Sequence, residues 1–264
     1  MYVYTEMKSD KISIIIPILN EATTIVSLLK HVLKSVKYQQ HEILLIDGGS
    51  TDHTVEIVSE FIANFYAQHH SSPKRCVDHL FENETSNLHI QLFSSEKGRA
   101  KQMNFGAQKA TGTILYFLHA DTFPPTHFDE YILTEVHEGN QAGCFRLKFD
   151  YPHPVLLVSQ FFTRFNKSWC RGGDQSLFVL KSLFDELEGY DEAYAIYEDC
   201  EFINRLYEED KFTVIPKSVK TSARKYKVNG TWKLQYHFAM IHIKKSKGAT
   251  PEELHAYYKK YVAG

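Results

Sequence analysis

The chain has 264 residues, enough for one large or two small domains with a substantial core. Its hydrophobic content of 43% and charged content of 23% are ordinary for a soluble globular protein. A formal net charge of −2 provides no broad basic field, which argues against nucleic acid as a partner.

The N-terminal sequence and the cysteines indicate the cellular compartment. The N-terminus lacks the charged-then-apolar pattern of a signal peptide, and no uninterrupted apolar run reaches transmembrane length. The 4 cysteines are scattered without a CxxC pair, which argues against a zinc knuckle or a disulfide framework and fits a reducing compartment. We therefore expect a cytoplasmic protein.

The first 122 residues alternate between apolar β-rich runs and helical patterns. This alternation predicts a largely parallel sheet covered by helices on both sides. Asp52 is interpreted as the cap of the second helix, and the polar stretch 71–87 as a surface loop or insertion. Strands are expected at 12–19, 42–47, 88–93 and 113–118, with helices from 20–23 onward, from 54 to about 66, and between 98 and 112.

The second half of the chain is less regular, and no linker divides it from the first. The predicted fold class is α/β, a mostly parallel open sheet with a helical C-terminal extension, in a single domain over residues 1–264. The patterns predict strands at 144–149, 175–180 and 212–215, and helices at 155–165, 198–207, 231–244 and 251–262.

Polar side chains stand where the predicted strands end. Asn20 and Glu21 follow the first strand, Asp47 ends the second, and Asp121 follows the fourth. The carboxyl ends of such strands meet at the crevice where open α/β sheets bind ligands. Asp121 has a second interpretation, as the cap of the helix after Pro124 and Pro125. There is no GxGxxG after the first strand and no GxxxxGK[ST], so a dinucleotide oxidoreductase and a P-loop NTPase are poorly supported.

Six stretches in this order resemble the motifs of the family-2 glycosyltransferases of GT-A fold. The similarity extends over nearly the whole chain and is greatest to a compact, soluble bacterial branch that keeps HAD at the metal motif. The stretches are IIPILNE (15–21), IDGGSTD (46–52), GRAKQMNFGAQKATG (98–112), FLHADT (117–122), GGDQSLFV (172–179) and YEDCEFINRL (197–206).

The resemblance implies a donor site for a nucleotide-diphosphate sugar in residues 1–122. The base would be uracil or another small base. Asp121 would hold Mg²⁺ or Mn²⁺ against the diphosphate, hard cations that prefer oxygen ligands. Implied donor-side residues are Pro17, Asn20, Glu21, Asp47, Gly98, Arg99 and His119.

The acceptor side is implied in residues 123–264. Gly172, Gly173 and Asp174 would shape it, and Asp199 would be the general base. The basic stretch around Arg224 either closes over the phosphates or is a solvated loop.

Three departures from the family pattern stand out. Gly48 occupies a position that is usually acidic, so only Asp47 can read the base. His119 replaces the first carboxylate of the DxD motif, where a neutral imidazole can still hydrogen-bond a ribose hydroxyl. No QxxRW-like motif follows, which argues against a processive polysaccharide synthase.

The leading hypothesis is an inverting, metal-dependent glycosyltransferase that uses a UDP-sugar and an unidentified acceptor, which is a small molecule, a glycan or a lipid. His119 in place of aspartate suggests a rival, a nucleotide-sugar-binding protein without turnover. A sugar-phosphate nucleotidyltransferase ranks last, because no glycine- and arginine-rich loop follows the first strand.

The apolar stretch 232–245 precedes a lysine cluster and has several interpretations. It contacts the inner face of a membrane, packs over the sheet, lines the acceptor cleft or mediates a homodimer. Its apolar residues fall on several helical faces, which favours burial.

Overall fold

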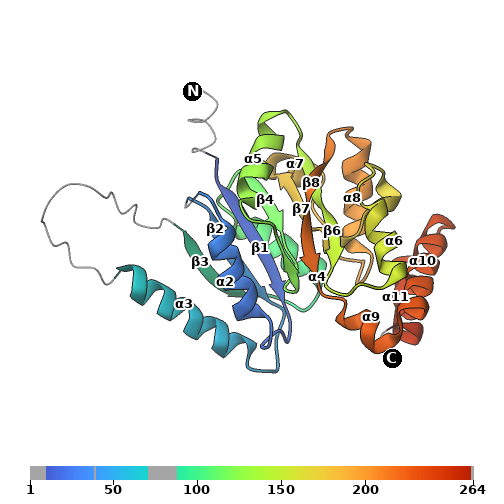
Figure 1. The fold of residues 1–264 in the computed structure, drawn as a ribbon, viewed down its shortest axis with the longest axis horizontal. Helices are drawn as coiled ribbons and strands as arrows, with labels where there is room; N and C mark the ends of the chain where they lie inside the picture. The colour runs from blue at the N-terminus through green and yellow to red at the C-terminus, as the bar shows by residue number, and fades with distance from the viewer. Residues whose placement is uncertain (1–9, 39, 71–87, 263–264) are drawn as a thin grey trace, which may run out of the picture.

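A computed structural model describes residues 10–38, 40–70 and 88–262; the loop predicted at 71–87 lies outside this range. The described strands form one mixed sheet in the order β3-β2-β1-β4-β7-β6-β8-β5 (Figure 1). The strands are β1 (Ile12–Ile18), β2 (Glu42–Asp47), β3 (His89–Ser94), β4 (Ile114–Phe117), β5 (Thr122–Phe123), β6 (Ala142–Phe149), β7 (Leu177–Leu180) and β8 (Phe212–Thr221).

The predicted mostly parallel sheet is confirmed. β1 pairs in parallel with both β2 and β4, and β2 pairs in parallel with β3. β7 runs antiparallel to both β4 and β6, and it joins this half to the parallel pair β6–β8. The strand order reverses at β1, so the carboxyl ends of β1 and β4 flank the crevice where such sheets bind ligands.

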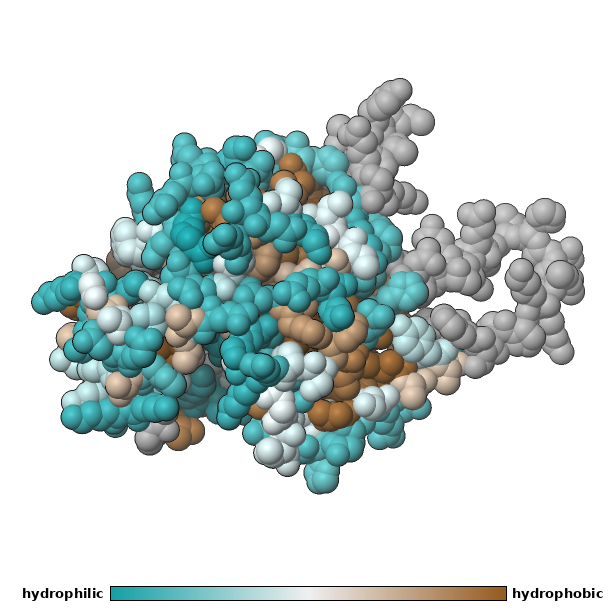
Figure 2. Space-filling view, turned by 180° about the vertical axis from the view of Figure 1, so that it is seen from behind, coloured by the Kyte–Doolittle hydropathy of each residue, from teal (hydrophilic) through white to brown (hydrophobic). Residues whose placement is uncertain are grey.

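Helices cover both faces, as predicted. One apolar core lies under α2, α3, α5 and α6, and a second lies under α4, α7 and α8. The side turned away in Figure 1 is mostly hydrophilic, with apolar side chains gathered near its middle (Figure 2). The helices are α2 (Ile25–Ser35), α3 (Thr54–His70), α4 (Arg99–Lys109), α5 (Phe128–His137), α6 (Pro154–Phe162), α7 (Lys181–Glu186), α8 (Glu198–Glu208), α9 (Arg224–Asn229), α10 (Thr231–Ser246) and α11 (Pro251–Tyr261), with short 3₁₀ turns η1 (Ser168–Cys170) and η2 (Gly173–Gln175).

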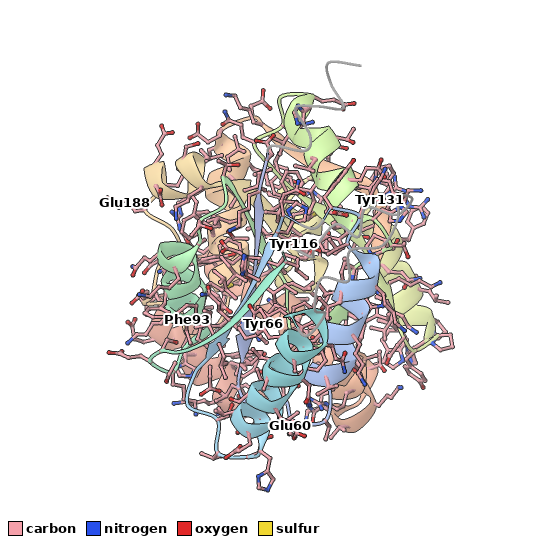
Figure 3. All side chains as sticks on the ribbon, turned by 90° about the vertical axis from the view of Figure 1, so that its left-hand side faces the viewer. Glu60, Tyr66, Phe93, Tyr116, Tyr131 and Glu188 are labelled. Atoms are coloured by element: carbon pink, nitrogen blue, oxygen red, sulfur yellow. The ribbon has the colours of Figure 1, made fainter. Side chains whose placement is uncertain are left out.

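Burial on both faces explains the apolar run of β1. Ile14 and Ile16 enter the first core, and Ile15 enters the second. A strand covered on both sides gains from apolar, β-branched residues at every position. Tyr116 of β4 lies at the middle of the sheet, where its ring stacks on Phe128 at 5.3 Å between centroids (Figure 3).

Strand β8 is longer than the four residues predicted from its apolar start. Ile215 pairs with Phe145 and Ser218 pairs with Arg146, so Pro216 and Lys217 form a bulge. A proline cannot donate to a ladder, and a bulge accommodates it. The bulge interrupts the sequence pattern, while the strand continues to Thr221, beside β5.

The C-terminal helices pack beside the sheet and not over it. α10 contacts α6, α9 and α11 at one end of the molecule (Figure 1). Ile241 and Leu254 form a small third core with Tyr194, and Thr250 closes a capping box at the start of α11. Within the described residues, no helix is long and apolar enough to cross a bilayer.

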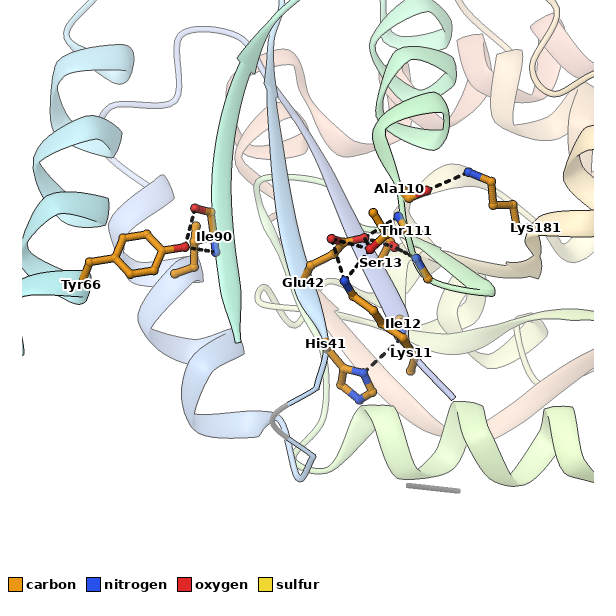
Figure 4. Close-up of polar contacts among 11 residues, drawn as sticks. Lys11, Ile12, Ser13, His41, Glu42, Tyr66, Ile90, Ala110, Thr111 and Lys181 are labelled. Atoms are coloured by element: carbon orange, nitrogen blue, oxygen red, sulfur yellow. Dashed lines mark hydrogen bonds and ion pairs between the residues drawn. The ribbon is translucent and has the colours of Figure 1, made fainter. Parts of the chain in front are cut away.

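A buried carboxylate ties together the amino ends of the strands (Figure 4). Glu42 accepts hydrogen bonds from Lys11 Nζ at 2.9 Å, Ser13 Oγ at 2.5 Å and the Thr111 backbone N–H at 2.7 Å. Burial raises the pKa of Glu42, but these donors lower it overall below its usual 4.5. The network fixes the end of the sheet opposite the candidate site.

We predict that Glu42→Gln lowers the free energy of unfolding by about 2 kcal/mol at pH 7, because hydrogen bonds to a charged group each contribute about that much. A lowered folded-state pKa stabilises the fold above the unfolded value of 4.5 and loses this effect as pH falls through the folded value. Urea unfolding should therefore show the two proteins converging as the pH falls below 4.5 and through the folded-state pKa of Glu42. Glu60→Gln, on an exposed position of α3, is the control; equal losses in both variants would contradict the prediction.

Candidate active site

The turns after β1 and β2 are linked through Asn20. This residue has left-handed backbone geometry (φ +57°), which asparagine tolerates. Its side-chain oxygen accepts hydrogen bonds from the backbone N–H groups of Thr51 at 2.8 Å and Asp52 at 3.3 Å. The Asp52 carboxylate accepts from the backbone N–H of Thr54, so the interpretation of Asp52 as a helix cap is confirmed.

Asp47 lies buried at the end of β2 and shapes the following turn. Its carboxylate accepts from the backbone N–H of Gly49 at 3.0 Å and from Ser50 Oγ at 2.6 Å. Of the other predicted donor-side residues, Pro17 is buried within β1, and Glu21 accepts from Thr24 Oγ1 at 2.7 Å. The structure therefore brings these residues to one edge of the sheet.

Gln102 on α4 is a site residue that the sequence reasoning missed. Its buried amide donates to the carbonyl oxygens of Ile18 at 2.9 Å and Ile46 at 2.7 Å, so it bridges the ends of β1 and β2. A β-carbon at Gly48 would lie 2.9 Å from this amide, which explains the glycine there. The available signal was a glutamine beside Met103 on the face of the helix that packs on the sheet.

His119 lies between two carboxylates at the end of β4. Its Nδ1 is 3.4 Å from Asp174 Oδ1, and its Nε2 is 3.5 Å from Asp199 Oδ2. Burial and the nearby charge of Arg99 lower the pKa of His119, but the two carboxylates outweigh them and raise it to about 9. At neutral pH this side chain is therefore a buried imidazolium that joins the predicted acceptor-side residue to the predicted base.

Arg99 supplies the second positive charge. Its guanidinium is 3.2 Å from Glu198 Oε1 and 3.8 Å from Asp199 Oδ2, which links α4 to the start of α8. Burial lowers the pKa of Arg99, but the surrounding carboxylates raise it overall. Burial and the neighbouring Asp199 charge raise the pKa of Glu198.

Asp174 and Asp199 differ in their surroundings. The Asp174 side chain is 52% exposed and that of Asp199 is 12% exposed. Although burial raises the pKa of Asp174, the charges of His119, Arg99 and Lys225 lower it overall. Asp174 thus lies at the mouth of the site and Asp199 lies deeper.

The two predicted glycines before Asp174 have different surroundings. A β-carbon at Gly173 would lie 1.9 Å from Asp199 Oδ2 and 2.8 Å from His119 Cε1. A β-carbon at Gly172 would meet nothing within 4 Å. Only Gly173 is therefore required by close approach to the carboxylate, and the two neighbours form a matched pair for substitution.

Asp121 lies in the turn between β4 and β5, partly exposed. Its backbone carbonyl accepts from the Ser222 N–H at 3.3 Å, which brings the basic stretch after β8 next to it. Arg224 is exposed at the start of α9, and two irregular residues, Ser222 and Ala223, connect this helix to the end of β8. The charge of Lys225, the neighbour of Arg224, lowers the pKa of Asp174, an interaction that the sequence did not indicate.

Within the described residues, no group of three or more His, Cys, Asp or Glu side chains is arranged to hold a metal alone. Mg²⁺ commonly binds one or two protein carboxylates and completes its shell with substrate phosphates and water. The partly exposed Asp121 carboxylate fits that role. The donor set therefore suits a metal that binds together with a diphosphate.

Solved structures share this architecture. The mannosyltransferase PcManGT of Pyrobaculum calidifontis, determined with GDP-Man and Mn²⁺, aligns with a TM-score of 0.63 and 17% identity over 94% of this chain and 69% of that one. TarS of Staphylococcus aureus (residues 1–349), determined with UDP, aligns with a TM-score of 0.58 and 16% identity over 81% of this chain and 60% of that one. The fold is therefore that of GT-A glycosyltransferases.

Sequence comparison identifies the family. Residues 13–177 match the model of glycosyl transferase family 2, and the chain belongs to that family. Relatives include glycosyltransferase GlyG of Streptococcus pneumoniae, 28% identical over 49% of this chain and 36% of that protein. A PGL/p-HBAD biosynthesis glycosyltransferase of Mycobacterium tuberculosis is 32% identical over 44% of this chain and 37% of that protein. The matched region spans about a third of each relative's length.

We predict that the His119 imidazole titrates at a pKa of about 9 in metal-free protein. Asp174→Asn should lower this value, because one of two facing carboxylates is removed, and Asp185→Asn, on the exposed surface of α7, should not. A raised histidine pKa stabilises the fold fully below pH 6.5, and this effect is lost as pH rises through 9. NMR titration, with the resonance assigned from His119→Gln, makes the measurement; titration near 6.5 would contradict it.

Proposed function

We propose that the protein is an inverting, metal-dependent glycosyltransferase that moves a sugar from a nucleoside-diphosphate donor to an acceptor hydroxyl. The observation that carries this proposal is the position of Asp199, a buried carboxylate held beside His119 and Arg99 at the carboxyl edge of the sheet. Family membership supports the reaction class. The neighbours determined with UDP, UDP-GlcNAc or GDP-Man support this donor class, and we favour a UDP-sugar.

Residues of the first 122 positions bind the donor in this proposal. In this proposal Asp47 also accepts an N–H of the base. Three donors of its own turn already contact the carboxylate, the backbone N–H groups of Gly49 and Ser50 and the Ser50 hydroxyl, and an ionised carboxylate has about four acceptor positions. The linked turns at Asn20 and Glu21 border this pocket, and Pro17 and Gly98 shape its walls. His119 and Arg99 face the ribose and the phosphates.

The diphosphate leaves from beside Asp121. A divalent cation, Mg²⁺ or Mn²⁺, held by this carboxylate would neutralise the negative charge of the leaving group. Arg99 of α4 and Arg224 of α9 would add positive charge for the phosphates. A PcManGT structure that contains Mn²⁺ supports the metal requirement.

Residues 123–264 provide the acceptor side. The acceptor oxygen attacks the anomeric carbon as the bond from that carbon to the diphosphate breaks, and its proton passes to Asp199. Because the displacement occurs in one step, the configuration inverts. His119 orients the Asp199 carboxylate through Nε2, and Asp174 with Gly172 and Gly173 shapes the entrance.

A second candidate is a nucleotide-sugar-binding protein without turnover. The pairing of His119 with Asp199 favours it, because this carboxylate oxygen already faces the imidazole nitrogen at 3.5 Å, where a general base would face the acceptor hydroxyl. Release of nucleoside diphosphate separates the two: the enzyme releases UDP or GDP from a matched sugar donor with Mn²⁺, and the binding protein shifts thermal stability with the donor but releases none.

We predict that Asp199→Asn lowers transfer by about 10²–10⁴-fold, the usual effect of losing one positioned proton acceptor. Donor affinity should change little, because the base faces the acceptor. Glu201→Gln, two residues along the same helix, is the control, because Glu201 pairs with Arg205. If Asp199→Asn keeps near-normal turnover while Glu198→Gln or Asp174→Asn loses it, the base is that other carboxylate.

We also predict different roles for the two strand-end aspartates. Asp121→Ala should abolish the Mn²⁺-dependent part of nucleoside diphosphate binding, because it removes the protein ligand. Asp47→Ala should weaken binding with or without metal, because its contact is to the base. Isothermal titration calorimetry with and without Mn²⁺ distinguishes the two; equal Mn²⁺ dependence in Asp121→Ala and wild type would refute the assignment.

A further inference from the structure

Exposed apolar side chains gather on α6 and the 3₁₀ turn that follows it. Val158 is 58% exposed, Phe161 is 46% exposed and Trp169 is 68% exposed. The rings are in contact with one another, with centroids 6.0 Å apart for Phe162 and Trp169. Contiguous exposed apolar area of this kind marks an interaction surface.

This surface continues onto the C-terminal helices. Trp232 at the start of α10 is 73% exposed, and its ring lies 6.4 Å from that of His153, which precedes α6. His153 stacks on Tyr151, and Lys227 of α9 lies over the Tyr151 ring at 5.1 Å. Figure 1 shows α6, α9 and α10 together at one end of the molecule. We call these residues of α6, η1, α9 and the start of α10 the end surface.

The charged residues of the end surface are basic. No Asp or Glu occurs between Asp150 and Asp174, or between Asp210 and Glu252. The exposed basic residues on or between the elements of the end surface are Arg164, Lys167, Arg224, Lys225, Lys227 and Lys233, in a chain whose net charge is −2. Arg164 lies directly over the Phe161 ring at 3.9 Å, so positive and apolar groups alternate on the same surface.

We propose that the end surface docks on an anionic lipid membrane. Insertion of tryptophan and phenylalanine side chains at the boundary between headgroups and acyl chains is energetically favourable. Lysine and arginine beside them pair with anionic headgroups. A nucleic acid would bind through the positive charge alone and would not require exposed valine and leucine side chains. An anionic lipid surface binds both the basic and the apolar side chains.

The end surface adjoins the acceptor side of the candidate site. Lys225 of α9 lowers the pKa of Asp174, and Trp169 precedes Asp174 by a few residues in a turn that packs on α8. Docking would therefore hold the mouth of the site at the headgroups. Vesicle binding requires neither donor nor acceptor, so its outcome is independent of the proposed glycosyl transfer.

The chain contains a natural probe, because its 2 tryptophans, Trp169 and Trp232, both lie on the end surface. Vesicles containing phosphatidylglycerol should shift the tryptophan emission to the blue, and brominated acyl chains should quench it. Phosphatidylcholine vesicles should do neither, and added salt should weaken binding. Co-sedimentation with vesicles without quenching would place the contact elsewhere and overturn the proposal.

Arg164→Gln with Lys167→Gln should weaken vesicle affinity by about 30-fold, since each basic residue near an anionic surface contributes about 1 kcal/mol. The matched control is Lys30→Gln with Lys34→Gln, which removes two exposed charges from α2 and should change affinity by less than about twofold. Equal losses in both pairs would show a non-specific charge effect and refute the proposal. Shielding of the tryptophans by self-association without lipid, seen by sedimentation velocity, would assign the surface to a second copy instead.

Discussion

The pairing of His119 and Arg99 with three carboxylates holds the carboxyl edge of the sheet together. Asp174, Glu198 and Asp199 come from two different elements and meet at one place. Negative charges gathered this closely repel one another. Two fixed positive charges keep the group compact, so the half of the chain that contains β1 and β4 is joined to the half that contains α8.

This pairing gives a physical reason for a histidine at position 119. An aspartate at position 119 would place another negative charge close to Asp174 and Asp199, which lie 3.4 and 3.5 Å from the imidazole nitrogens. Like charges at that separation strongly oppose joint ionisation. The imidazolium reverses the sign of the interaction. His119 and the acidic side chains around it therefore belong to one arrangement.

The parts of the fold that are set by local pattern could be predicted from the sequence. β1 and β2 could be predicted because burial on both faces of the sheet requires unbroken apolar runs. The nearness of Asn20 and Asp47 could be predicted because the carboxyl ends of neighbouring strands meet in such sheets. The bulge at Pro216 was hidden, because its pairing depends on β6. The partners of His119 were hidden as well, since they lie 55 and 80 positions away in the chain and only packing brings them together. Gln102 was missed because its bonds to two carbonyl oxygens follow from how α4 crosses the strands.

In the proposed mechanism, the position of the Asp199 carboxylate, set by its close packing, determines turnover. The most direct test compares Gly173→Ala with Gly172→Ala, because only the first substitution places a β-carbon against Asp199. Displacing a catalytic group by about 1 Å can cost about 10²-fold in rate. We predict that Gly173→Ala retains its fold and donor affinity and loses transfer by about that factor, while Gly172→Ala stays close to wild type. Equal activity of the two variants, whether both are active or both are impaired, would contradict the account.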